Sequence, residues 1–228
     1  MSIAAGVLLI VLPLAFNAAF ALLAATFDYP EVLRRPTQEV LARFHAGGAR
    51  LVMLWWGFAM TAVAVAPLAV LVAAALADAD PVVLRSTVVT GVLAALVQFL
   101  GLVRWPFLVP YLARVSTDPA STPARREAVD IVFQAVNRYL GVAVGEHLGY
   151  LFTGTWSVLV GVAATQSVAV PGWLGVIGIV IGVVLALCSL EFVGPFEQAG
   201  WRLAGAVIPI AYVIWSVWLV ALGIALLL

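Results

Sequence analysis

The chain has 228 residues, of which 65% are hydrophobic and only 10% are charged, and its formal net charge is zero. A soluble domain is about half apolar and about a quarter charged, so this composition excludes an ordinary water-soluble protein. The balanced charge removes the electrostatic basis for binding nucleic acid. Long runs of Ala, Val, Leu and Gly do not alternate with polar residues. They therefore indicate membrane-spanning helices of about 20 residues rather than the strands of a membrane barrel.

The apolar runs predict an all-α bundle of six spans in a single membrane domain covering residues 1–228. The first span is expected at 3–27, because this uncharged run is too long for a cleaved signal peptide. A short amphipathic helix is expected over 37–45, capped by Thr37 and stopped by Gly47 and Gly48. The later spans are expected at 51–76, 86–113, 139–164, 173–193 and 203–228. The intervening cytoplasmic segments are expected at 28–50, 114–138 and 194–202.

Two boundaries carry local signals. The third span stays apolar beyond Arg104 despite Pro106 and Pro110, so it either ends at 103 or continues, kinked, to 113. Thr122 followed by Pro123 is typical of a helix start. This pair predicts a long helix that begins with a polar face and then enters the membrane as the fourth span.

The basic residues predict an orientation. All eleven are arginines. Arg85 lies in the second connection, and the other ten are counted with the first, third and fifth connections, where Arg104 belongs to the third if the third span ends at 103. The positive-inside rule places these connections in the cytoplasm. Both termini are therefore expected outside it.

The fourth span contains the segment GVAVGEHLGY. Gly141, Gly145 and Gly149 recur every four residues, a spacing that predicts close helix packing. Glu146 is an ionisable residue inside a span, which makes it a candidate functional residue. The helical rise places Arg104 at a similar depth if the third span continues past it. An ion pair between Arg104 and Glu146 is one interpretation, and an interfacial Arg104 pointing at lipid headgroups is the other.

Polar residues near Glu146 predict a small pocket for a ligand, lipid or ion. Tyr139 lies seven residues before Glu146, and Tyr150 and Thr153 lie four and seven residues after it, so an α-helix would place all of them on one face. Other candidate members of the pocket are His147 and Gln98, and Asn17 and Glu191 are further candidates, of which Glu191 lies near a span end. The alternative is that these groups satisfy one another and only fasten helices together.

The sequence assigns no catalytic residue, cofactor or metal site. It has no HExxH motif, serine elbow or paired carboxylates, which argues against an enzyme. The single cysteine, Cys188, is expected to pack in the core. His147 and His45 are the only histidines. A membrane haem protein is a remote alternative, because His45 would have to leave the surface helix to become an axial ligand.

The segments FDYPEVLRRP, RWPFLVPYLAR and NRYLGVAVGEHLGY are similar to a bacterial multi-pass membrane family known only as a domain of unknown function. The resemblance covers nearly the whole chain. It implies a bacterial cytoplasmic membrane and lends no activity or site. The leading hypothesis is a protein that binds, or also transports, a small ligand within the bundle. The alternative is a non-catalytic accessory or regulatory subunit. Besides the lipid bilayer, a membrane protein partner or a homo-oligomer is conceivable.

Overall fold

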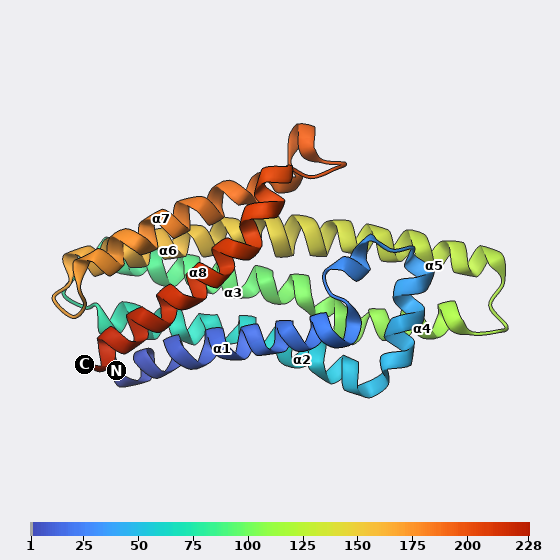
Figure 1. The fold of residues 1–228 in the computed structure, drawn as a ribbon, viewed down its shortest axis with the longest axis horizontal. Coiled ribbons are helices and arrows are strands. Elements are labelled where there is room, and N and C mark those ends of the chain that lie inside the picture. Colours follow the sequence, from blue (N-terminus) through green and yellow to red (C-terminus); the bar gives the residue numbers. More distant parts are fainter. Residues whose placement is uncertain (1) are drawn as a thin grey trace.

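The computed structural model describes residues 2–228, and it is helical almost throughout (Figure 1). The elements are α1 (Ser2–Phe27), η1 (Glu31–Arg34), α2 (Thr37–Ala75), α3 (Pro81–Phe107), α4 (Val109–Thr117), α5 (Pro123–Val136), η2 (Asn137–Leu148), α6 (Gly149–Gln166), α7 (Gly172–Cys188), η3 (Ser189–Phe192), η4 (Gly194–Phe196) and α8 (Arg202–Leu227). Within residues 2–228, six helical segments are long and apolar enough to cross a membrane. The predicted class, an all-α membrane bundle of six spans, is confirmed.

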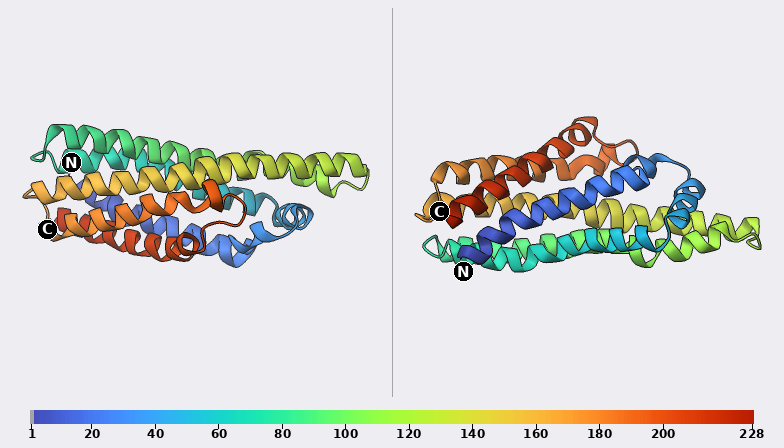
Figure 2. Two further views of the ribbon diagram at one scale, coloured as in Figure 1. Left: turned by 90° about the horizontal axis from the view of Figure 1, so that it is seen from above. Right: turned by 60° about the horizontal axis from the view of Figure 1, so that its bottom comes forward.

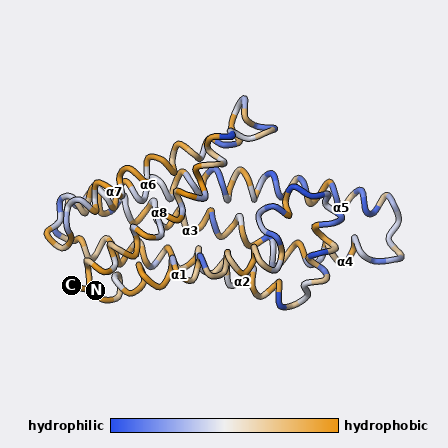
Figure 3. Tube along the Cα trace, in the orientation of Figure 1, coloured by the Kyte–Doolittle hydropathy of each residue, from blue (hydrophilic) through white to orange (hydrophobic). Residues whose placement is uncertain are grey.

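The six spans pack as a ring in chain order. Each span contacts the next, in the sequence α1, α2, α3, α6, α7, α8, and α8 returns to contact α1. Both termini lie at one end of the ring (Figure 1). The opposite end is the more hydrophilic one (Figure 3) and carries most of the arginines. We call these the terminal end and the arginine-rich end.

The apolar core is continuous at the terminal end and divided at the other. One large cluster around Trp156 joins α1, α2, α3, α6, α7 and α8 in the terminal half. In the arginine-rich half, a second cluster contains Trp55 and Trp105, whose rings stack with centroids 4.4 Å apart. A separate small cluster holds Cys188 and Ile208 on α7 and α8. The interior between these two clusters is therefore available to polar side chains.

The start of α2 matches the predicted surface helix and corrects its cap. Gly48 breaks the helix with φ +56°, a left-handed conformation that glycine adopts without strain. Thr37 does not cap the helix, because it already lies in the first turn after the N-cap residue Pro36. The Thr37 hydroxyl instead accepts a hydrogen bond of 2.8 Å from Nε2 of Gln134, which ties α2 to α5.

The third and fourth spans extend beyond the membrane as a helical hairpin. α3 continues past Arg104 to Phe107, and after Leu108 the chain resumes as α4. The backbone N–H of Arg125 donates to the Thr122 hydroxyl, which confirms the predicted start of α5. α5, η2 and α6 then form one continuous rod (Figure 2). Its 44 residues cover roughly 65 Å, about twice the hydrocarbon thickness of a bilayer. The α4/α5 hairpin therefore projects from the arginine-rich end.

Candidate functional site

Glu146 lies on η2, a π-helical stretch between α5 and α6. Hydrogen bonds in a π-helix run between residues five apart, and such stretches within α-helices often occur at functional sites. The wider turn also changes which residues share a face. Tyr139, seven residues before Glu146, is 68% exposed, whereas Glu146 is half-buried. The structure therefore does not place Tyr139 in the surroundings of Glu146.

Three contacts at glycines join the fourth span to α3. The facing pairs are Gln98 with Gly149, Gly101 with Gly145, and Arg104 with Gly141. At the middle pair the two backbones touch, because a Cβ built on Gly101 would lie 2.5 Å from Cα of Gly145. Since the helices run antiparallel, this crossing fixes the register in which α3 presents its polar side chains to the fourth span.

Arg104 is half-buried between α3 and η2. Its Nε and Nη2 donate to Oδ1 of Asn137 at 3.2 and 2.9 Å, and its Nη1 donates to the carbonyl of Gly101. A Cβ at Gly141 would lie 2.7 Å from Nη2, so the guanidinium occupies the space left by that glycine. These acceptors are neutral. The positive charge of Arg104 is thus hydrogen-bonded but not balanced by a contacting carboxylate.

Glu146 has no bonded partner. Within residues 2–228 its carboxylate makes no ion pair, and the hydrogen bonds around it are made by other side chains. The direct ion pair with Arg104, one of the two interpretations of the sequence, does not form. The charged side chains whose fields reach Glu146 are those of Glu191 and Arg104. Glu146 is therefore a half-buried acid that no side chain in residues 2–228 pairs with.

Tyr29, directly after α1, faces the same two charges. Burial, aided by the charge of Glu146, raises the pKa of Tyr29 to about 12, and the charge of Arg104 acts in the opposite direction. The ring packs edge-on against Trp55, with centroids 5.0 Å apart. Tyr29 thus adds a hydroxyl group on the α1 side of Glu146.

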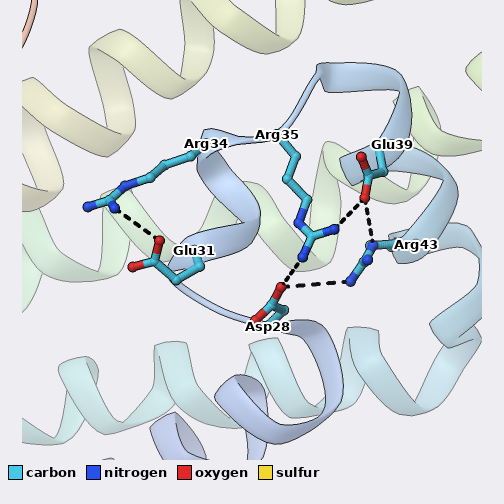
Figure 4. A network of polar contacts seen from close by, with 6 residues as sticks. All are labelled: Asp28, Glu31, Arg34, Arg35, Glu39 and Arg43. Atoms are coloured by element: carbon cyan, nitrogen blue, oxygen red, sulfur yellow. Dashed lines mark hydrogen bonds and ion pairs between the residues drawn. The ribbon is translucent and has the colours of Figure 1, made fainter.

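An ionic network holds the segment that carries Tyr29 (Figure 4). Arg35 donates to Asp28 at 2.5 Å and to Glu39 at 2.6 Å, and Arg43 contacts Glu39 at 3.2 Å. Glu39 and Asp28 together keep the pKa of Arg35 above its ordinary value. The network fastens the end of α1 to the first turns of α2, and this limits the movement of Tyr29.

Tyrosine and amide groups continue the polar surface deeper into the ring. Tyr150 and Tyr212 meet edge-to-face with centroids 5.7 Å apart. Nε2 of Gln98 donates to Oγ1 of the buried Thr153 at 2.6 Å. The hydroxyl of Ser157, one turn further, donates to the carbonyl of Thr153 at 2.8 Å. We call Tyr29, Arg104, Glu146, Tyr150 and Tyr212 the Glu146 cluster.

The polar surface ends at a small cavity between α1, α2, α3 and α8. Its volume is about 20 Å³, and its polar lining comes from Thr61, Gln98 and Tyr212. This volume holds about one water molecule. Beyond it, the apolar cluster around Trp156 fills the terminal half. The interior is therefore closed toward the terminal end.

In the part of the chain that the structure describes, the two histidines make no hydrogen bond to the residues of the Glu146 cluster. Nδ1 of His147 lies 2.7 Å from the carbonyl oxygen of Ser189, so the ring connects η2 to η3. His45 is exposed on the first part of α2. The structure does not bring them together as a pair of haem ligands. Within residues 2–228, no three side chains of His, Cys, Asp or Glu gather in a way that could hold a metal ion.

Three functional candidates were missed by reasoning from the sequence. Asn137 holds Arg104, while Tyr29 comes from the turn after α1 and Tyr212 from α8. Spacing along the fourth span could not identify the two tyrosines, because they come from distant elements. The only sequence signal was a polar group at the edge of, or within, an apolar run.

Comparison with known proteins identifies a family without an activity. No curated protein and no solved structure matches the chain. A family match covers residues 4–223, which is nearly the whole ring of spans. The chain therefore belongs to the family described as a domain of unknown function (DUF4386).

Proposed function

We propose that this chain is a membrane-embedded binding protein that takes up a small polar or amphiphilic ligand at the Glu146 cluster. The observation that carries the proposal is the unpartnered carboxylate of Glu146, which lies half-buried inside a span. An acid in such a place is costly unless it is paired or meets water or a ligand. Because no side chain within residues 2–228 satisfies it, a ligand is the partner that best explains its position.

The packing of α1 against α8 indicates where the ligand enters. At the terminal end the helices are in close contact, since a Cβ on Gly223 would lie 2.7 Å from the carbonyl of Gly6. Asn17 still hydrogen-bonds to Ser216 at 2.9 Å. Beyond that point the two helices diverge toward the arginine-rich end (Figures 1 and 2). Because the terminal end is closed by the contact between Gly6 and Gly223 and by the apolar cluster around Trp156, we propose entry from the arginine-rich end.

The distribution of arginine supports an orientation for this route. The positive-inside rule places the arginine-rich end in the cytoplasm and both termini outside it, in a bacterial cytoplasmic membrane. Glu146 then lies on the cytoplasmic side of the bilayer centre. In this orientation the ligand comes from the cytoplasm or from the inner leaflet.

Thiol accessibility tests the proposed entry route. In a Cys188→Ala background, Glu146→Cys is expected to react with a membrane-impermeant maleimide in inside-out vesicles but not in right-side-out ones. Val160→Cys is a matched control, because Val160 is fully buried in the terminal half and should not react. The exposed Tyr139→Cys should react and shows that the reagent works. No reaction at position 146, with Tyr139→Cys labelled, would refute a ligand route to Glu146.

A groove at the projecting hairpin favours a second candidate function, that of an accessory subunit. The groove lies between the start of α2 and α5, has a volume of about 620 Å³, and carries Arg126, Glu127 and Asp130. Such a mixed-charge surface suits a polar partner segment. Purification in mild detergent should then yield a second protein in constant ratio. Recovery of the chain alone would count against this function.

A further inference from the structure

We infer that the ligand of the Glu146 cluster is zwitterionic, with its cationic group at Glu146 and its anionic group at Arg104. This inference rests on the proposed function. Both residues are half-buried, and within residues 2–228 neither makes an ion pair. One cation and one anion without contacting counter-ions therefore lie in one cluster.

The structure keeps these two charges from neutralising each other. Arg104 is held by Asn137, by the carbonyl of Gly101, and by the space at Gly141. Moving the guanidinium to Glu146 would break the two hydrogen bonds to Asn137. Because Asn137 is neutral, the charge of Arg104 remains available to an anionic group.

Ligands with a single charge fit this arrangement less well. A cation at Glu146 gains from that carboxylate and from Glu191, but the field of Arg104 opposes it. An anion at Arg104 gains from the guanidinium, but the charge of Glu146 opposes it. A zwitterion oriented with its charges opposite to those of the protein gains at both positions. The charges of both Glu146 and Arg104 also act on the buried Tyr29.

The spacing indicates which zwitterions fit. Arg104 lies against Gly141, and Glu146 is five residues further along η2. A ligand that reaches both residues therefore needs an ammonium group and an anionic oxygen group joined by a chain of several atoms. A free ω-amino acid has this chemistry, and so does an aminoethyl phosphate headgroup of a lipid. The two sources share the recognition chemistry and are separated by the test.

The experiment uses the purified full-length protein and charge-matched probes. Calorimetric titration compares 4-aminobutyrate with butylamine and butyrate, each of which carries only one of its charges. For the lipid arm, the protein is reconstituted into nanodiscs that contain phosphatidylethanolamine and phosphatidylglycerol in equal amounts. Native mass spectrometry then compares how much of each lipid the protein retains. We expect a preference of about tenfold for the zwitterion in one of the two arms, because the second charged group adds a charge-assisted contact. The arm that shows the preference identifies a soluble or a lipid source.

Variants assign each half of the ligand. Glu146→Gln should abolish the preference for the zwitterion over the anionic probe, and Arg104→Gln should abolish its preference over butylamine. Arg104→Lys keeps the charge and controls for folding. Asp78→Asn removes an acid at the terminal end and should leave the preference unchanged.

Equal binding of the zwitterionic and singly charged probes, or binding of none of them in either arm, would overturn the inference. If Glu146→Cys still reacts from the arginine-rich end in that case, the proposed function stands while the zwitterion assignment fails. If position 146 does not react, the proposed function fails as well.

Discussion

The crossing of α3 and η2 gives a prediction that follows directly from geometry. Gly101→Ala places a methyl group 2.5 Å from Cα of Gly145 and 3.1 Å from the carbonyl oxygen of Leu140. Ordinary carbon–carbon contacts are about 3.5–4.0 Å, so the overlap with Cα is roughly 1 Å. Both neighbours are backbone atoms, which no change of rotamer can move. The helices must therefore separate by about that amount.

Overpacking of this kind costs about 1–3 kcal/mol, and the better helix propensity of Ala offsets up to about 1 kcal/mol. We expect a net loss of about 1–2 kcal/mol. At about 2–4 °C per kcal/mol for a chain of this size, the thermal midpoint should fall by roughly 2–8 °C. Gly57→Ala is the matched control, because no heavy atom lies within 4 Å of its added methyl group. That variant should keep or raise the midpoint.

Cys188 provides the assay. It is the only cysteine and is 5% exposed, so a fluorogenic thiol reagent reports its exposure as the protein unfolds in detergent. The reasoning is refuted if Gly101→Ala unfolds within about 1 °C of Gly57→Ala. A double variant with Gly145→Ala should lose less than the sum of the single losses, because one separation of the helices makes room for both methyl groups.

Three further predictions test other parts of the molecule. Ser157→Ala removes the hydroxyl that accepts a hydrogen bond of 2.8 Å from the buried Trp215 Nε1–H. The thermal midpoint should fall by the equivalent of about 0.6–1.7 kcal/mol. An unchanged midpoint would mean that the indole N–H finds another acceptor. The Ser167 hydroxyl, with a backbone N–H, keeps the pKa of Asp78 below its ordinary 3.8. A carboxyl group whose pKa is lowered in the folded state stabilises the fold at pH values above its ordinary pKa, and this stabilisation is lost as the pH falls through the folded-state pKa. Below about pH 4 the melting temperature of the native protein should therefore fall more steeply with pH than that of Asp78→Asn. Parallel plots of melting temperature against pH would contradict this. A C-terminal reporter that is active only in the cytoplasm should be silent, and activity would reverse the orientation.

The sequence predicted the fold well because long apolar runs have only one stable conformation in a bilayer. The break at Gly48 and the start of α5 at Thr122 were also readable, since each depends on local backbone chemistry. The site was only partly readable. The reasoning that placed Tyr139 beside Glu146 assumed α-helical periodicity, and the π-helical winding of η2 invalidates that assumption. No residue pattern in this segment indicated the change.

The contacts of α3 could not be derived from depth alone. Helical rise suggested that Arg104 and Glu146 lie at similar depth, but it did not determine the direction in which each side chain points. The direction of each side chain depends on the face of the fourth span against which α3 packs. That face was indicated by the glycine spacing, yet the partner helix and its register became known only from the structure. Tyr29 and Tyr212 depend on tertiary packing in the same way.

The glycine crossing and the unpaired charges have one cause. Gly145 turns its Cα toward α3, and the next residue on a helix is rotated by roughly a quarter turn. Glu146 therefore lies beside the line of contact with α3, whereas Arg104 on α3 lies on that line at Gly141. A larger residue at position 145 would push the helices apart and relax both constraints. The contact that holds the two spans together thus also keeps this acid and this base apart, as the proposed ligand site requires.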